Sequence, residues 1–258
     1  MSQSPYPNSA FHLLGEERID TLGGNGRNRT LAIQAFEWEI KVRKALLAPT
    51  EITEITLRNA IDKAIDSWWN EKNLPRTWTD TPLPIEAESL MPFVHSESWK
   101  KRAKSNLPKG RQINHEDLIA HTSFGTWKNM IGNPLSLNQK KSTGYNQIKS
   151  WNAAKKRDEQ CSRLWREIIS TAFPYLPQTK SARGKLSPRA YIGTRVARTA
   201  ALRNRTFHWD NLTKTNIAMR YKDMLEIVSS INPQVGDWMD GICAEQIKSV
   251  IENKPSWL

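Results

Sequence analysis

Arg203 and His208 stand five residues apart in the stretch LRNRTFH at positions 202–208. RNA cleavage without a metal ion requires that the 2′-hydroxyl lose a proton and the leaving 5′-oxygen gain one, and histidine titrates near neutral pH. A guanidinium offers a fork of donors to phosphate oxygens as negative charge builds on them. Five residues on an unbroken helix rotate about 140°, so we expect the helix to end between the pair, and Asn204 tolerates such an ending. The candidate catalytic residues are Arg203, Asn204 and His208.

The spacing of this pair is weak evidence when taken alone. With eighteen arginines and five histidines in 258 residues, the number of such pairs expected by chance is roughly one-third. The structural alternative is a capping arginine near a buried histidine. Other catalytic patterns are missing from the sequence: GGNG at 23–26 lacks the Lys-Ser/Thr of a phosphate-binding loop, and His115 and His121 have no cysteine or third histidine nearby for zinc. We therefore predict no metal and no cofactor.

The positive charge of the chain is concentrated in one segment. The formal net charge is +12, but residues 100–209 hold 23 basic and 5 acidic residues, a net of +18, and the rest of the chain has a net of −6. A segregated field of this size attracts polyanions. We therefore predict RNA binding, and the alternatives are a solvated basic face or, less favoured, an anionic lipid surface. The predicted RNA-binding residues are Lys100, Lys101, Arg102, Lys104, Arg198 and Arg205.

Apolar residues recur at helical spacing along nearly the whole chain, and no segment shows the sustained alternation of a strand. The predicted helices cover residues 31–49, 52–69, 114–131, 146–173, 188–202, 217–231 and 238–251. Pro49 is expected to end the first, Asn114 to cap the third, and Ser187-Pro188 to begin the fifth. The pattern predicts an all-α protein with an N-terminal helical region at 1–95 and a basic helical region at 96–258, or one continuous domain.

Bulk properties favour a soluble protein that folds in the cytoplasm. Eleven tryptophans argue against disorder, because disordered chains have no core in which to bury large aromatic side chains. No apolar run approaches the ~18 residues of a membrane span. Cys161 and Cys243 lack a Cys-x-x-Cys spacing and are expected to be buried thiols, which fits a reducing compartment.

The motif stretch resembles the Arg-Asn-x-x-x-His signature of HEPN ribonucleases. Its form is most similar to the Leu-Arg-Asn-Arg-x-x-His-His-Glu version in the Abi-like (abortive infection, AbiD/AbiF type) family. Further stretches resemble segments of that family in the same order along residues 11–245, and they are EERI (16–19), FEW (36–38), ITLRNAI (55–61), EDLI (116–119), SFGTW (123–127) and INP (231–233) with Trp238.

This resemblance implies a HEPN-type helical bundle with additional N-terminal helices. It also implies an endoribonuclease that leaves a 2′,3′-cyclic phosphate and acts as a toxin in phage defence, held in check by a protein or RNA antitoxin. Because two motifs usually form one site, it implies a homodimer in which each copy contributes Arg203 and His208, and Asn204 matches the Asn of the signature. The chain departs from the pattern at Trp209 and Asp210, which replace the second His and the Glu.

Two alternatives belong to other classes of function. A HEPN-derived RNA-binding protein would form a ribonucleoprotein with a cognate non-coding RNA without cutting it. A DNA-binding regulator would use a compact helix-turn-helix, and no short helix pair with a glycine turn is evident. Only the ribonuclease predicts cleavage that depends on His208.

Overall fold

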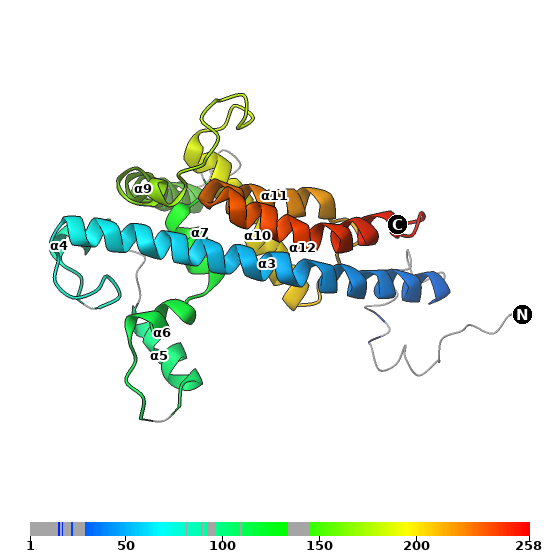
Figure 1. Cartoon of the computed structure of the whole chain (residues 1–258), viewed down its shortest axis with the longest axis horizontal. Helices are drawn as coiled ribbons and strands as arrows, with labels where there is room; N and C mark the ends of the chain where they lie inside the picture. Colours follow the sequence, from blue (N-terminus) through cyan, green and yellow to red (C-terminus); the bar gives the residue numbers. More distant parts are fainter. Residues whose placement is uncertain are drawn as a thin grey trace, which may run out of the picture.

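A computed structural model describes residues 15, 17, 22, 29–80, 82–88, 90–91, 96–108, 110–133 and 145–258. These residues form helices and no strand, which confirms the predicted all-α class (Figure 1). The helices are α3 (Arg29–Glu71), α4 (Ile85–Glu88), α5 (Ser96–Asn106), α6 (His115–Ala120), α7 (Phe124–Ile131), α9 (Tyr145–Glu167), the 3-10 turn η1 (Ile169–Ala172), α10 (Pro188–Phe207), α11 (Ile217–Ile231) and α12 (Pro233–Glu252).

The long helix α3 runs straight through Pro49, so the predicted helix end at this proline is wrong. A proline inside a helix removes one backbone hydrogen bond and costs about 3 kcal/mol. Burial on both sides of Pro49 offsets that cost, because Val42 and Leu46 before it and Leu57 after it are fully buried. The 43 residues of α3 therefore form one continuous support for α11 and α12, which pack along it (Figure 1).

Two buried clusters form the core of the described residues. One gathers side chains such as Trp78, Trp127 and Tyr191 around the second half of α3. The other joins Trp38 of α3 to Leu202 of α10 and to the inner faces of α11 and α12. Both clusters contain residues from either side of position 95, and the division into regions 1–95 and 96–258 stays a prediction.

Several predicted helix starts are confirmed, and two predicted helices are shorter than expected. Asn114 caps α6 through a full capping box, and Ser187 accepts a hydrogen bond at the start of α10. The helix expected over 114–131 is divided into α6 and α7, because the backbone at Ser123 is extended, with φ of −74° and ψ of 149°. Similarly, α9 ends at Glu167 and the chain continues as η1.

The end of α7 lies against α10 with no side chain between the two backbones. A Cβ at Gly193 would lie 2.2 Å from the carbonyl oxygen of Gly132, so only glycine fits there. Gly132 itself caps α7 with φ of +71°, a conformation that favours glycine. This close contact fixes the position of α10, the helix that carries the motif.

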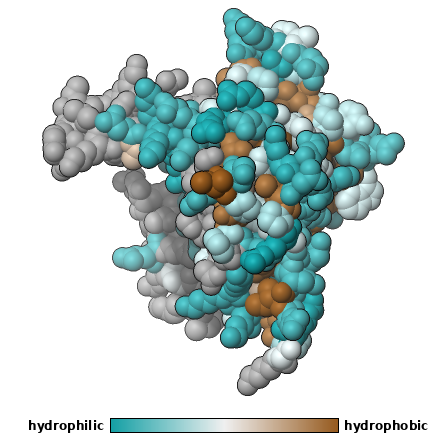
Figure 2. Space-filling model, turned by 90° about the vertical axis from the view of Figure 1, so that its left-hand side faces the viewer, coloured by the Kyte–Doolittle hydropathy of each residue, from teal (hydrophilic) through white to brown (hydrophobic). Residues whose placement is uncertain are grey.

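None of the helices that the structure describes is both long and apolar enough to cross a membrane. The face in Figure 2 is dominated by hydrophilic side chains, between which hydrophobic ones appear as separate patches.

Candidate functional site

The motif occupies the last turns of α10. Arg203 and Asn204 lie within the helix, which ends at Phe207, and His208 is its C-terminal cap. The backbone N–H of His208 still donates to the carbonyl of Asn204 at 2.9 Å, with φ of −89° and ψ of 8°. Asn204 and His208 are exposed, so the buried histidine of the structural alternative is not observed.

Arg203 and His208 therefore do not converge in the way the sequence suggested. The boundary of α10 does fall between them, but the chain turns only after His208, at Trp209 with φ of +57°. Since His208 keeps the helical hydrogen bond, the two side chains leave the axis about 140° apart. A single chain thus presents an arginine and a histidine on different sides of one helix end.

Arg203 is held from behind by α3. Its Nε lies 3.7 Å from Oε2 of Glu54, and this nitrogen is buried without a hydrogen-bond partner among the described residues. The guanidinium carbon lies 4.5 Å from the centre of the Phe207 ring. The side chain is 35% exposed. The arginine is thus fixed on its inner side and accessible on its outer side.

Glu54 is the partner that sequence analysis missed. Burial raises the pKa of its carboxyl group, and the neighbouring Arg203 and Arg58, followed by a hydrogen bond with the Phe124 backbone, oppose this shift. Glu54 thus joins α3 to the start of α7 and to the motif on α10. The i, i+4 spacing of Glu54 and Arg58 is visible in the sequence, but it does not reveal the contact with Arg203.

The loop after α10 is anchored to the first half of α3. The ring of Trp209 stacks with Phe36 at a centroid distance of 6.1 Å, and the Arg43 guanidinium lies 4.9 Å from its centre. Arg43 also donates to the carbonyl of Asp210 at 2.6 Å. Trp209, which replaces the second histidine of the Abi-like pattern, therefore serves as an anchor for the backbone next to His208.

The predicted RNA-binding residues fall into two groups. Lys101, Arg102 and Lys104 are exposed on α5 and Lys100 is half-buried there, and α5 packs on α6 in a lobe to one side of α3 (Figure 1).

The second group is on α10 with the motif. Arg198 forms an ion pair with buried Asp223 at 3.5 Å, yet its side chain stays 45% exposed. Arg205 is half-buried and donates to the carbonyl of Asn211, so part of its hydrogen-bonding capacity stabilises the loop. Arg198, Arg203 and Arg205 therefore share one helix, and the basic residues of α5 lie on a separate element.

Among the described residues, Asp62, Asp66 and His115 bring one potential ligand atom each within 4.8 Å of one another. The sequence prediction of no metal did not anticipate this group. His115 donates or accepts at both ring nitrogens, with Thr79 Oγ1 at 2.9 Å and Asp62 Oδ1 at 3.0 Å. The hydrogen bond to Asp62 raises the pKa of His115, against the effect of burial. Through these contacts the three residues form an ion-pair cluster that connects α3 to α6.

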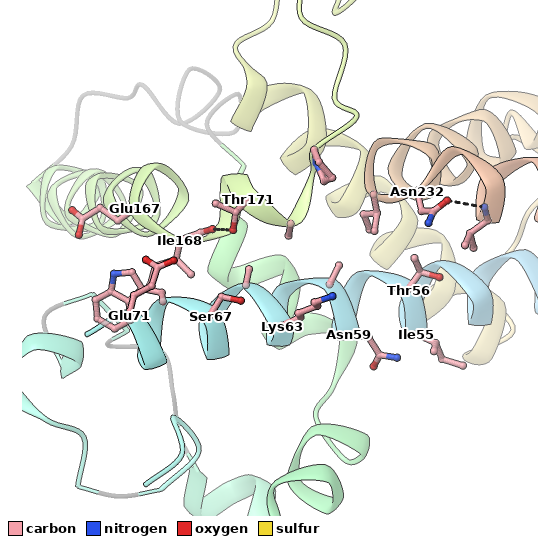
Figure 3. A pocket seen from close by; sticks show the side chains of 17 residues that line it. Ile55, Thr56, Asn59, Lys63, Ser67, Glu71, Glu167, Ile168, Thr171 and Asn232 are labelled. Carbon is pink, nitrogen blue, oxygen red and sulfur yellow. Dashed lines mark hydrogen bonds between the residues drawn. The ribbon is translucent and has the colours of Figure 1, made fainter. Parts of the chain in front are cut away.

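A groove of about 630 Å³ lies between α3, η1 and the start of α12 (Figure 3). Its floor is mostly apolar and includes Trp68 and Ile168, and Glu71 and Glu167 lie at one end. None of the three candidate catalytic residues lines it. The groove is thus separate from the motif at the end of α10.

Comparison of the chain with protein-family models, curated proteins and solved structures returns no match.

Proposed function

We propose that this protein is a HEPN-type endoribonuclease that binds RNA through basic surfaces and cuts it at Arg203, Asn204 and His208. The observation that carries the proposal is the end of α10, where Arg203 is braced by Glu54 and His208 stands exposed on a loop anchored to α3. The HEPN and Abi-like assignment rests on the sequence motif, and the all-α fold is compatible with it.

The proposed reaction needs only proton transfer and charge stabilisation. The 2′-oxygen of one ribose loses its proton to a histidine and attacks the adjacent phosphorus, and the bond to the 5′-oxygen breaks. The leaving 5′-oxygen gains a proton from the His208 of a second copy of the chain, so the products are a 2′,3′-cyclic phosphate and a 5′-hydroxyl. The outer nitrogens of Arg203 stabilise the negative charge on the phosphate oxygens.

The divergence of Arg203 and His208 within one chain supports a composite site. In a two-fold dimer, His208 of one copy can approach the phosphate that Arg203 of the other holds, because a symmetric interface brings the same surface of both copies together. Light scattering in moderate salt should then give about twice the 29.6 kDa of one chain. A strict monomer that cuts RNA would contradict the composite site.

The proposed biological role is that of a toxin in phage defence, active in the cytoplasm and restrained by an RNA or protein antitoxin. Expression of the wild type should then arrest bacterial growth. Sequencing of the nucleic acid that copurifies with the protein would show whether a discrete RNA accompanies it.

The decisive experiment compares cleavage by the wild type, His208→Ala and Arg203→Ala. Removal of an acid or base typically costs 10²–10⁴-fold in rate, and both variants should keep most RNA affinity because His208→Ala leaves the basic segment unchanged and Arg203→Ala removes only one of its 23 basic residues. His12→Ala, outside the described residues and without an assigned role, is the control. Cleavage by the wild type should continue in EDTA, and its abolition would refute the proposed chemistry.

A second candidate function is RNA binding without cleavage. The replacement of the usual second His and Glu by Trp209 and Asp210 favours it, because Trp209 cannot transfer a proton. Equal inactivity of the wild type and His208→Ala on all RNAs, including RNA from phage-infected cells, would favour this binding protein over the nuclease.

A further inference from the structure

Exposed apolar side chains surround the motif on the surface. Phe207 is 51% exposed at the last position of α10, and Trp209 is 43% exposed two residues later. Leu47 is 45% exposed on α3. It lies between Arg43 and Glu54 in sequence, at spacings of four and seven residues that place all three on one face of the helix. Arg43 contacts Trp209 and Glu54 contacts Arg203, so this face of α3 borders the motif.

The two aromatic rings differ in what already covers them. Trp209 has Phe36 stacked on it and the Arg43 guanidinium over it, which together fix the ring against α3. Phe207 has the Arg203 guanidinium on one side at 4.5 Å and about half of its surface in solvent. Phe207 thus presents open aromatic surface directly beside the arginine of the proposed site.

The combination of Phe207 and Arg203 suits one nucleotide of a single strand. Proteins bind single-stranded nucleic acid by stacking its bases on aromatic rings and pairing its phosphates with basic side chains. Arg203 and Phe207 are four residues apart on α10, so their side chains lie on the same side of the helix. A base on the open side of Phe207 therefore lies next to a phosphate that the outer nitrogens of Arg203 can reach.

We propose that Phe207 forms a nucleobase subsite, on which an unpaired base of single-stranded RNA stacks while Arg203 binds a neighbouring phosphate. The subsite rests on the proposed function, because it names the part of the RNA that the motif contacts. It requires an unstacked base, so it selects single strands and loops over duplex RNA. Stacking accepts every base, so the subsite sets the strandedness of the substrate more than its sequence.

The test compares binding of two uncleavable probes, a 12-residue 2′-O-methyl uridine oligomer and an abasic oligomer of the same length and charge. Phe207→Leu should weaken binding of the uridine oligomer by roughly 5- to 100-fold, the range of one base–aromatic stack. It should leave binding of the abasic oligomer unchanged. Phe207→Trp should restore binding of the uridine oligomer. Trp238→Leu is the control, since Trp238 is 56% exposed on α12 and has no proposed contact with RNA.

Results other than this base-dependent loss would refute the subsite, the nuclease or both. An equal loss on both oligomers, or no loss on either, would refute the subsite. The subsite would also be refuted if Phe207→Leu changed the molecular mass measured by light scattering but did not change base-dependent binding. Phe207 would then be a contact between protein chains. Base-dependent binding without any RNA cleavage would keep the subsite and refute the nuclease. If the wild type cleaves RNA but Phe207→Leu does not change base-dependent binding, the nuclease is kept and the subsite is refuted. If the wild type binds neither oligomer, the nuclease and the subsite are both refuted.

Discussion

Arg203 Nε and Glu54 Oε2 lie 3.7 Å apart across the contact between α10 and α3, 149 positions apart in the chain. The carboxyl group of Glu54 is mostly buried behind the arginine, and its pKa is raised chiefly by that burial. A buried carboxylate with a raised pKa disfavours the folded state at neutral pH, even with an arginine beside it. The molecule thus holds Arg203 in place at some expense of stability, as is common at functional sites.

Glu54→Gln should separate stability from activity. Because the pKa of Glu54 is raised in the folded state, the neutral glutamine should leave the free energy of unfolding at pH 7 unchanged or higher. Loss of the charge behind Arg203 should lower kcat for RNA cleavage by about tenfold or more, with little change in KM. Denaturant titration and steady-state kinetics measure the two effects.

Glu71→Gln is the matched control, since Glu71 is exposed at the C-terminal end of the same helix α3. It should change neither quantity by a measurable amount. A Glu54→Gln variant that unfolds more easily at pH 7 and cleaves RNA at the wild-type rate would show that the pair is purely structural.

Charge reversal on α5 should weaken RNA binding mainly at low salt. If six phosphate contacts form, wild-type affinity should fall on the order of 10³-fold between 50 and 200 mM salt. Substitution of Lys100, Lys101, Arg102 and Lys104 by Glu should reduce the slope of log affinity against log salt by up to about 3. The control reverses the exposed charges of Lys41, Lys44, Lys214 and Lys248. An affinity that does not respond to salt would contradict the electrostatic interpretation.

The contact between α3 and α6 should weaken as the pH rises. The Nε2 atom of His115 lies 3.0 Å from Oδ1 of Asp62 and 3.9 Å from Oδ2 of Asp66. The hydrogen bond to Asp62 and the negative charges of Asp62, Asp66 and Glu116 raise the pKa of His115 in the folded state, although burial opposes this. Its stabilising contribution is therefore fully present below the unfolded pKa of about 6.5 and is lost as the pH rises through the higher folded value.

Urea unfolding midpoints between pH 5.5 and 9 measure this effect. The difference between wild type and His115→Asn should shrink as the pH rises. His121→Asn, which leaves the pair with Asp62 intact, should retain the wild-type profile. If the difference in unfolding midpoint between wild type and His115→Asn is constant over this pH range, the ion pair of His115 with Asp62 does not contribute to stability.

Gly193→Ala should destabilise the fold by at least about 2 kcal/mol, because the new Cβ would meet a backbone oxygen that cannot move alone. The carbonyl of Gly132 would lie 2.2 Å away. Gly241→Ala on α12 is the opposite control, since nothing lies within 4 Å of its Cβ position. It should raise stability by about 0.5–1 kcal/mol, the usual gain of alanine over glycine inside a helix. Thermal unfolding of both variants measures this, and equal effects would show that α7 and α10 can move apart.

The sequence by itself determined the helical class and several helix ends, because both depend on residues close together in the chain. The apolar spacing of residues 217–231 predicted α11 with its observed bounds. The capping residues Asn114 and Ser187 act on backbone groups within three residues of themselves, so their effect is readable locally. The motif is also readable locally, because Arg203 and His208 stand only five residues apart in the sequence.

Only the tertiary structure decided what holds the motif and which way it faces. Pro49 predicts a helix end from local chemistry, but burial of α3 against distant helices overrides that preference. Glu54, Phe36 and Arg43 meet α10 and its loop across some 150 to 170 residues, and no local pattern encodes such contacts. The divergence of Arg203 and His208 depends on one hydrogen bond to Asn204, which sequence spacing alone does not determine. Packing energy is a sum over residues far apart in the chain, so the tertiary fold selects among the local conformations that the sequence permits.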